Sequence, residues 1–255
     1  MNTDFLPPLS AVVAEMTGQT HAHLVACHSR DPRAVPLGQV TQGRKDEQGD
    51  IRVHREVLAP LQRLRDKARA AGFELAIASS FRNFDRQQRI WREKAAGQRP
   101  VFGADGEPLL PEALSDDELL WAILRWSALP GTSRHHWGTD LDVYDASAVD
   151  AGYRLQLVPE EYQPRGPFGP FRHWLERLIA DGDAEGFYHP YAHDRGAVAP
   201  EPWHISYRPV AQYYQSLLSF EVFEQLLHSG AWPLTETIAT HAEDIYRRFV
   251  QLQFP

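Results

Sequence analysis

The stretch PGTSRHHWGTDLD, residues 130–142, carries most of the information in this chain of 255 residues. It begins with a Pro-Gly break and ends in the alternation of polar and apolar residues that is typical of a strand. His135 and Asp142 place an imidazole and a carboxylate within eight residues. Catalytic zinc takes three protein ligands from His, Asp, Glu or Cys and keeps a fourth position for water. The stretch therefore predicts part of a zinc site near the start of a strand.

Two further stretches complete this set of chemical groups. EPWH, residues 201–204, adds the imidazole of His204 and the carboxylate of Glu201. SSFRNFDRQ, residues 79–87, lies between an expected strand and an expected helix and contains Arg82. Two histidines, one aspartate and a glutamate that does not bind the metal form the set that a zinc hydrolase needs. Each stretch alone also has an ordinary structural interpretation, such as a packed histidine, a solvated aspartate or an ion-pairing arginine.

Hydrophobic spacing predicts the helices and strands around these stretches. Helices are expected at residues 4–18, 53–71, 84–94, 115–126, 171–180, 211–228 and 235–252, and strands at residues 73–79, 141–144 and 204–207. Pro60 lies inside the second of these helices, which is therefore expected to start or kink there. Residues 96–114 and 159–170 are rich in Pro and Gly and predict two long loops.

The order of these elements indicates the fold class. Helices and strands are mixed without a regular alternation of strand and helix, which favours an α+β fold over a doubly wound parallel sheet. No Pro-, Gly- or Ser-rich linker divides the chain. We therefore expect a single domain over residues 1–255, with helical additions at both termini.

Composition excludes several classes of function. Lys and Arg number 26 and Asp and Glu number 34, so the net charge is −8, which argues against nucleic acid as a partner. The longest apolar run, Leu119–Leu124, is far shorter than the ~20 residues of a membrane span. Cys27 is the single cysteine, so an intrachain disulfide is impossible. Residues 24–27, LVAC, look like a lipoprotein box, but no basic segment or apolar segment precedes them, and a cytoplasmic location is expected.

The three stretches together resemble the VanY-type zinc D-alanyl-D-alanine carboxypeptidases, metallopeptidases of the hedgehog/DD-peptidase fold. Residues 133–142 fit the pattern S-x-H-x-x-G-x-x-x-D, and residues 201–204 fit E-x-W-H. Residues 79–87 are similar to S-x-Y-R-S-x-x-x-Q, with Phe81 in place of Tyr and Asn83 in place of Ser. The motifs occur in the order of the family. The resemblance implies a small antiparallel sheet with helices.

The resemblance also implies a role for each matching residue and a division of the chain. It implies a peptidase core at residues 53–208, with mainly helical additions at residues 1–50 and 209–255. The implied zinc ligands are His135, Asp142 and His204. The implied catalytic residues are Glu201, as the general base, and Arg82, which steadies the substrate and the anionic tetrahedral intermediate. The implied substrate-binding residues are Ser133, near the terminal carboxylate of the substrate, and Gln87.

The implied activity is the removal of a terminal D-alanine from a peptidoglycan-derived peptide by water attack, with zinc as cofactor. Three alternatives stay open. The same fold could serve an L,D-carboxypeptidase or a D,D-dipeptidase, because the shape of the pocket determines stereochemistry. It could also serve a lytic endopeptidase, or a catalytically silent module that retains the metal. The sequence leaves the oligomeric state open.

Two residues next to the expected ligands depart from the family or add ambiguity. Asp140 stands where the family usually has Ala, and on a strand it would share a face with Asp142. It would then strengthen the hold on the metal, pair with Arg134, or lie at the surface. His136 follows His135 directly, and the Ser-x-His spacing selects His135 as the ligand.

Other polar and aromatic residues receive simpler interpretations. Glu201 and His204 would face opposite sides of a regular strand, so a shared site requires an irregular backbone near Pro202. Tyr188, Tyr191 and Arg195 precede this motif and are expected to line the substrate cleft. His21, His23 and His28 are expected at the polar surface.

Overall fold

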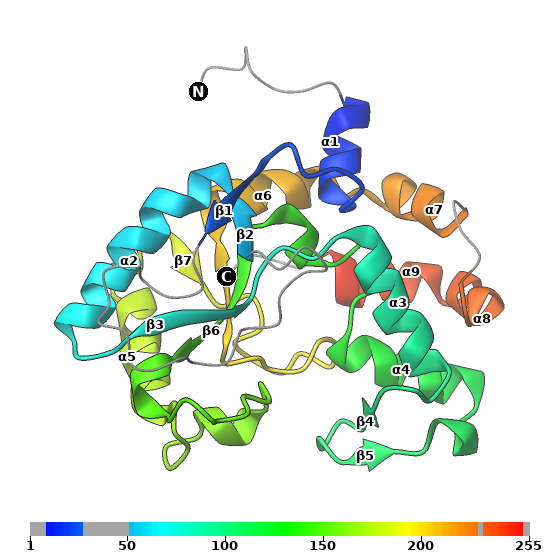
Figure 1. Cartoon of the computed structure of the whole chain (residues 1–255). Helices are drawn as coiled ribbons and strands as arrows, with labels where there is room; N and C mark the ends of the chain where they lie inside the picture. The colour runs from blue at the N-terminus through cyan, green and yellow to red at the C-terminus, as the bar shows by residue number, and fades with distance from the viewer. Residues whose placement is uncertain (1–8, 28–50, 229–231, 252–255) are drawn as a thin grey trace.

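A four-stranded antiparallel sheet forms the centre of the computed structural model, which describes residues 9–27, 51–228 and 232–251 (Figure 1). Its strand order is β3-β6-β8-β7. The strands are β3 Leu75–Ser79, β6 Asp140–Asp145, β7 Phe187–Tyr188 and β8 His204–Tyr207. Two small antiparallel pairs lie outside this sheet: β1 Leu24–Cys27 with β2 Ile51–His54, and β4 Val101–Phe102 with β5 Pro108–Leu109. The α+β prediction with a small antiparallel sheet is confirmed.

The helices surround this sheet and extend to the end of the described chain. They are α1 Leu9–Met16, α2 Leu58–Ala70, α3 Phe84–Ala95, α4 Asp116–Trp126, α5 Gly169–Ala180, α6 Arg208–Leu217, α7 Phe220–His228, α8 Thr235–Thr240 and α9 Ala242–Ile245. Short 3₁₀ turns occur at η2 Arg55–Val57, η3 Pro111–Ala113, η4 Arg134–Trp137, η5 Ala146–Ala148 and η6 Pro159–Tyr162, and a π-helix, η7, covers Tyr246–Val250. None of the helices in the described ranges is long and apolar enough to cross a lipid bilayer.

One face of the sheet packs against α2 and α5. Leu141 and Val143 of β6 and Ile205 of β8 are fully buried in a core that also contains Leu64 of α2 and Leu175 of α5. Successive side chains of a strand point to opposite faces, so Leu141 and Val143 leave the intervening Asp142 on the other face. The alternation of β6 therefore separates the apolar core from the polar residues of the expected site.

A second core joins α3 and α4 to the C-terminal helices. It contains Trp91 of α3, Leu120 and Leu124 of α4, Phe223 of α7 and Ile245 of α9. In Figure 1 these helices lie on one side of the sheet, opposite α2 and α5. The C-terminal helices therefore pack against α3 and α4, on the side of the sheet opposite α2 and α5 (Figure 1).

The expected helix at residues 53–71 is wrong at its beginning. Val53 belongs to β2, where it pairs with Val25 of β1, and α2 starts only at Leu58. Val53 fits a helical spacing as well as the strand alternation with Ile51, and only the pairing with β1 distinguishes the two. Pro60 is tolerated because it lies in the first turn, where its missing N–H would have no partner within the helix.

Other expected elements differ in detail. The expected loop at residues 96–114 contains the β4–β5 hairpin and η3, and the expected loop at residues 159–170 begins with η6. The two expected C-terminal helices are divided, at Leu218–Ser219 and again at His241. The expected helix at residues 4–18 is present as α1, and its residues 4–8 lie outside the described residues.

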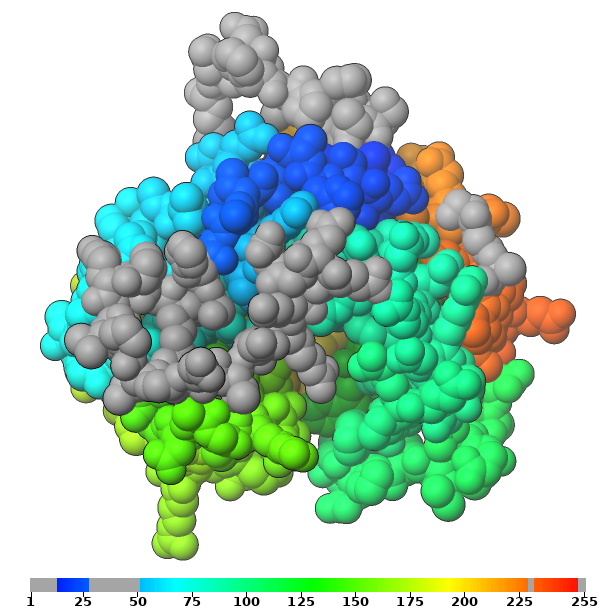
Figure 2. Space-filling view, in the orientation of Figure 1, coloured from blue at the N-terminus to red at the C-terminus, as the bar shows by residue number. Residues whose placement is uncertain are grey.

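The N-terminal part of the described chain lies against the rest of the molecule. Figure 2 shows α1 and β1 on the surface, between the residues of α2 and those of α7. His23 is buried rather than exposed, because its ring packs against Phe81, His54 and Tyr214. His21 is exposed as expected, and His28 lies outside the described residues.

Candidate active site

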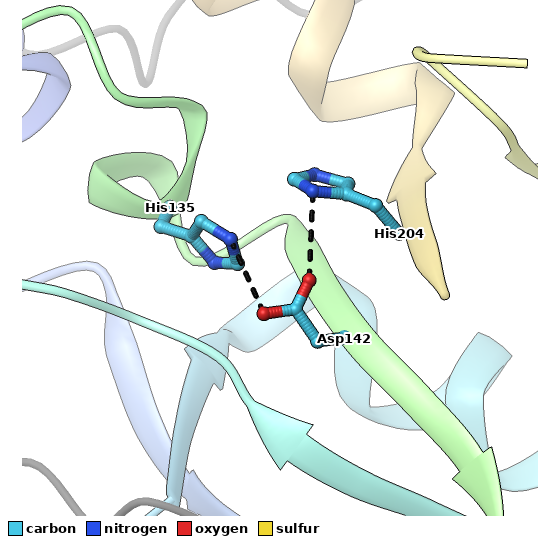
Figure 3. A group of neighbouring side chains, drawn as sticks. All are labelled: His135, Asp142 and His204. Atoms are coloured by element: carbon cyan, nitrogen blue, oxygen red, sulfur yellow. Dashed lines mark ion pairs between the residues drawn. The ribbon is translucent and has the colours of Figure 1, made fainter. Parts of the chain in front are cut away.

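The three expected metal ligands converge on one face of the sheet (Figure 3). His135 comes from η4, Asp142 from β6 and His204 from β8. Asp142 and His204 are directly opposite each other in the antiparallel pairing of β6 with β8. Pairing across neighbouring strands thus brings together two residues that are far apart in the sequence.

Gly138 makes the turn from η4 into β6 possible. Its φ of +69° lies in the left-handed region, which glycine adopts without steric cost. A Cβ at this position would lie 2.5 Å from Leu24 Cδ2 and 2.7 Å from the backbone nitrogen of His54. The glycine of the motif is therefore required both by its backbone conformation and by its contact with β1 and β2.

The distances within the triad suit a single tetrahedral ion. His135 Nε2 lies 3.6 Å from Asp142 Oδ2, and His204 Nδ1 lies 3.5 Å from Asp142 Oδ1. One possible ligand atom from each residue can be chosen so that all lie within 4.8 Å of one another. Ligand atoms about 2.0–2.2 Å from a tetrahedral zinc are separated by roughly 3.3–3.6 Å. The two distances to Asp142 already have almost this value, and all three ligand atoms lie within 4.8 Å of one another.

The second nitrogen of each histidine is held by a hydrogen bond. His135 Nδ1 donates to the carbonyl oxygen of Ser80 at 2.9 Å, which leaves Nε2 facing Asp142. His204 Nε2 donates to Asp140 Oδ1 at 2.9 Å, which leaves Nδ1 on the side of Asp142. Metal-binding histidines are typically oriented in this way by a carbonyl or carboxylate group. Asp142 Oδ1 is buried and accepts no hydrogen bond within the described ranges, as expected of an atom that binds a cation.

Asp140 is fully buried and paired with Arg134, so the surface interpretation of this residue is wrong. Arg134 Nε donates to Asp140 Oδ1 at 2.9 Å, and Oδ2 accepts from the hydroxyls of Thr139 and Ser206 at 2.6 and 2.8 Å. Burial alone would raise the pKa of Asp140, but the charge of Arg134 and the hydrogen bonds hold it well below its usual range. Asp140 is therefore an ionised residue that orients His204, a role that the sequence did not predict.

Arg134 connects this carboxylate to the surrounding elements. Its Nη2 donates to the Tyr188 hydroxyl at 2.7 Å and to Ser206 Oγ at 2.8 Å. Its Nη1 donates to Gln215 Oε1 at 3.2 Å, and the guanidinium carbon lies 4.6 Å from the ring centre of Trp137. Tyr188 therefore contacts Arg134 inside the protein, while Tyr191 lines the cavity as expected and Arg195 is exposed to solvent.

The two histidines of the triad have opposite protonation tendencies. Burial lowers the pKa of His135 well below its ordinary value, and the nearby charges of Arg82 and His204 lower it further. Burial would also lower the pKa of His204, but hydrogen bonds to Asp140 and Glu201 outweigh burial and raise this pKa to about 10. Burial and the negative charge of Glu201 raise the pKa of Asp142 to about 6.

Glu201 reaches the triad through a turn. The N–H of His204 donates to the carbonyl oxygen of Glu201 at 3.0 Å, so residues 201–204 do not form a regular strand. The expectation of an irregular backbone near Pro202 is confirmed. The turn places Glu201 Oε2 2.9 Å from His204 Nδ1, the nitrogen on the side of Asp142.

Arg82 is held at the wall of the same cavity by polar neighbours. Its Nη1 donates to Gln87 Oε1 at 2.7 Å, and Gln87 Nε2 donates to the Ala128 carbonyl oxygen at 2.6 Å. Gln87 is fully buried, so the structure places it behind Arg82. His136 Nδ1 donates to the Arg82 carbonyl oxygen at 2.5 Å, and its Nε2 accepts from the Gly131 N–H at 3.1 Å. Both nitrogens of His136 are thus engaged away from the triad.

One cavity contains nearly all of these groups. Its polar lining includes Arg82, Ser133, His135, Asp142, Glu201 and His204. Its apolar lining includes Leu124, Leu129, Ile245, Phe249 and Val250, which belong to the core shared by α4 and the C-terminal helices. The arrangement combines three possible metal ligands with the carboxylate of Glu201 and the guanidinium of Arg82, a set of groups that suits metal-assisted hydrolysis.

Comparison with solved structures gives similar folds of low sequence identity. The LdcB LD-carboxypeptidase is 21% identical, with a TM-score of 0.47 and coverage of 80% of this chain and 78% of that chain. A mutant of the vancomycin-resistance D,D-pentapeptidase VanY, in complex with Zn(II), is 22% identical, with a TM-score of 0.44 and coverage of 76% and 98%.

Sequence comparison gives relatives in two bacteria. An uncharacterised protein of Haemophilus influenzae is 31% identical over 124 residues, which are 48% of this chain and 92% of that protein. A D-alanyl-D-alanine carboxypeptidase of Enterococcus faecalis is 30% identical over 174 residues, which are 68% of this chain. The match spans 52%, about half, of the length of the Enterococcus protein.

The family model of VanY, described as D-alanyl-D-alanine carboxypeptidase, matches residues 50–210. The matched segment contains every residue of the triad together with Glu201 and Arg82. It covers well over half of the chain, and the chain therefore belongs to the VanY family of carboxypeptidases.

Proposed function

We propose that this protein is a zinc-dependent carboxypeptidase that removes a terminal D-amino acid, D-alanine, from peptidoglycan-type peptides. The observation that carries the proposal is the convergence of His135, Asp142 and His204 in a cavity that also contains Glu201 and Arg82. The ion would be held by His135 Nε2, His204 Nδ1 and the Asp142 carboxylate. This ion is supported by the two ring hydrogen bonds and by Asp142 Oδ1, a buried atom that accepts no hydrogen bond from the described residues.

When bound, zinc polarises a carbonyl group and lowers the pKa of water to about 7. Glu201 supplies the proton acceptor, because its Oε2 lies beside His204 Nδ1 on the side of the triad. The same oxygen can pass the proton to the leaving amine, as a general acid does after acting as a base. Such a step needs one carboxylate close to the ion, and the contact of Glu201 with His204 Nδ1 supports Glu201 in this role.

Arg82 and Ser133 would bind the anionic part of the substrate. The guanidinium of Arg82 is positioned by Gln87, so its charge is fixed at the cavity wall. A carboxylate or an oxyanion is best bound by a preorganised planar donor of this kind. Ser133 lines the same cavity and adds a hydroxyl donor for the terminal carboxylate of the peptide.

The proposed substrate is tested by mass spectrometry of peptides with D,D, L,D and L,L termini. We expect loss of one D-alanine from the D,D-terminated peptide. Release of a dipeptide, or cleavage restricted to the L,D-terminated peptide, would instead identify a D,D-dipeptidase or an L,D-carboxypeptidase. Cleavage of none of them by the zinc-loaded protein would favour the silent metal-binding module.

The metal site is tested by elemental analysis of a variant with alanine at His135, Asp142 and His204. We expect one zinc per chain in the unaltered protein and none in this variant, because three ligands define a catalytic zinc site. His136→Ala is the matched control and is expected to keep zinc, since both nitrogens of His136 bond elsewhere. Loss of zinc from His136→Ala, together with its retention in the triple variant, would contradict this ligand assignment.

Zinc binding is expected to release about one proton per site at pH 6.5. The pKa of His204 is about 10 without metal, so this ring carries a proton that must leave before Nδ1 can bind zinc. The pKa of Asp142 is about 6, so most of its carboxylate is already ionised at this pH. Zinc affinity should therefore rise as pH rises, up to the pKa of His204. Calorimetry in buffers of different ionisation enthalpy measures the released protons, and a value near zero would contradict the assignment of Nδ1 as a ligand.

A further inference from the structure

The cavity has an apolar wall, and part of this wall lies outside the segment matched by the family. The wall is formed by Leu124, Leu129, Ile245, Phe249 and Val250. The last three come from α9 and η7, about 35–40 residues beyond the end of the matched segment at residue 210. The C-terminal helices therefore do more than cover the core, because they contribute directly to the cavity that contains the triad.

Phe249 is the member of this wall that presents partly exposed surface. Ile245 and Val250 are buried in the core, whereas Phe249 is only half-buried. The Phe249 ring stacks on Trp121 of α4 with a centroid distance of 5.9 Å and an interplanar angle of 24°. The guanidinium of Arg248 lies 4.9 Å from the ring centre of Trp121 and donates to the Gly196 carbonyl oxygen. These contacts hold the ring in place at the edge of the cavity.

The wall is also tied to the triad by hydrogen bonds. Gln215 Nε2 donates to the carbonyl oxygen of Val250 at 2.9 Å, and Gln215 Oε1 accepts from Arg134 at 3.2 Å. Arg134 in turn pairs with Asp140, which orients His204. The last residue of η7 is thus connected to a triad histidine through buried or partly buried side chains. This connection links the position of Val250 to that of His204.

We propose that the apolar wall is a subsite for a substrate side chain larger than methyl, carried by a residue next to the scissile bond. The inference rests on the proposed function, because it takes the peptide to be cleaved at the triad of the same cavity. A bulky apolar side chain gains free energy by leaving water for this wall, whereas a charged one would lose its hydration there. The C-terminal segment 242–250 therefore sets the side-chain preference of this enzyme.

The test compares three acetylated peptides that differ in one side chain. They are N-acetyl-L-Lys-D-Ala-D-Ala, its analogue with D-Leu as the terminal residue, and its analogue with D-Leu as the penultimate residue. In the unaltered protein we expect one D-Leu peptide to have a kcat/KM at least about tenfold above that of the D-Ala peptide, since burying a few methylenes gives 10- to 200-fold. The position at which D-Leu raises kcat/KM shows which residue of the peptide binds the apolar wall.

Phe249→Ala is expected to reduce the ratio of kcat/KM for the preferred D-Leu peptide to that for the D-Ala peptide about tenfold or more, because it removes the accessible ring of the wall. Phe220→Ala is the matched control, since Phe220 is a half-buried phenylalanine of the same C-terminal region that packs on Tyr246 instead of lining the cavity. We expect the control to keep both the ratio and the overall rate. A ratio near one in the unaltered protein, or an equal ratio in Phe249→Ala, would overturn the subsite.

Binding of the same peptides to zinc-loaded Glu201→Gln separates this inference from the proposed function. If the unaltered protein cleaves none of the peptides, the proposed function fails. The subsite is then tested by the Kd values from calorimetry. The preferred D-Leu peptide should bind about tenfold more tightly than the D-Ala peptide, and Phe249→Ala should abolish this difference. The subsite alone fails if the peptides are cleaved but Phe249→Ala changes neither the kcat/KM ratio of the D-Leu and D-Ala peptides nor the ratio of their Kd values.

Discussion

Replacing Glu201 with glutamine is expected to lower the turnover of a D-alanyl-D-alanine-ended peptide by ~100-fold or more, with zinc still bound. General-base catalysis contributes typically 10²- to 10⁴-fold, and the amide of Gln cannot accept the proton. Glutamine nevertheless keeps the shape of the side chain. The measurements are kcat with the peptide and the zinc content of the same preparation.

The geometry separates this role from a purely orienting one. A residue that orients a metal-binding histidine bonds to the nitrogen that does not bind the metal. For His204 that nitrogen is Nε2, and Asp140 occupies it at 2.9 Å. Glu201 approaches Nδ1 instead, on the side that faces Asp142. Glu201 would therefore lie next to the proposed ion, where a base is needed, and its loss should leave the orientation of His204 intact.

Glu176→Gln is the matched control for this substitution. Glu176 is a partly exposed carboxylate on α5 that pairs with Arg172, so its loss should change neither zinc content nor turnover. If Glu201→Gln loses zinc in parallel with activity, the base assignment is rejected. Normal turnover of the zinc-loaded Glu201→Gln protein would reject it as well.

The residues of the triad could be predicted because two short motifs, at residues 133–142 and 201–204, resemble those of the VanY family. Ser133, His135, Gly138 and Asp142 lie within ten residues, and their spacing reflects one short turn followed by one strand. Gly138 is a clear example, since its positive φ and its contact with Leu24 explain why no other residue fits. Local spacing of this kind is readable from a single sequence.

The partners of these residues could not be predicted because tertiary packing supplies them. The sequence left three roles open for Asp140, and its contacts with Arg134 and Ser206 depend on the pairing of β6 with β8. Nothing in the local sequence indicates that Arg134 would contact Gln215, which is 81 residues away. The apolar wall is a similar case, since Phe249 lines the cavity and packs on Trp121, which is 128 residues away in the sequence.

The errors in secondary structure have the same origin. The apolar spacing from Val53 onward satisfies both a helix and a short strand, and the partner strand β1 determines the outcome. The last expected helix has suitable spacing throughout, but it is divided near His241 and ends in the π-helix η7. A π-helix often marks a functional position in a helix, and η7 carries two of the residues that line the cavity, Phe249 and Val250.

Substituting Arg134 with methionine is expected to lower the free energy of unfolding by about 3–5 kcal/mol, because it leaves a buried carboxylate without its cation. Asp140 is fully buried, and Arg134 is only 4% exposed. The fall in Tm should be roughly 6–20 °C for a chain of this size. Urea denaturation and calorimetry at a fixed zinc concentration measure the two quantities, since bound metal adds to apparent stability.

Two further variants show whether loss of the Arg134–Asp140 ion pair causes the fall in the free energy of unfolding. Arg134→Lys keeps the positive charge but loses the planar group that bonds Asp140, Tyr188 and Gln215 at once, so an intermediate loss is expected. Combining Arg134→Met with Asp140→Leu removes both charges, and this double variant should be more stable than Arg134→Met alone. Equal stability of Arg134→Met and the unaltered protein would contradict the argument. A double variant less stable than Arg134→Met would place the loss in packing around Trp137, over which the guanidinium lies.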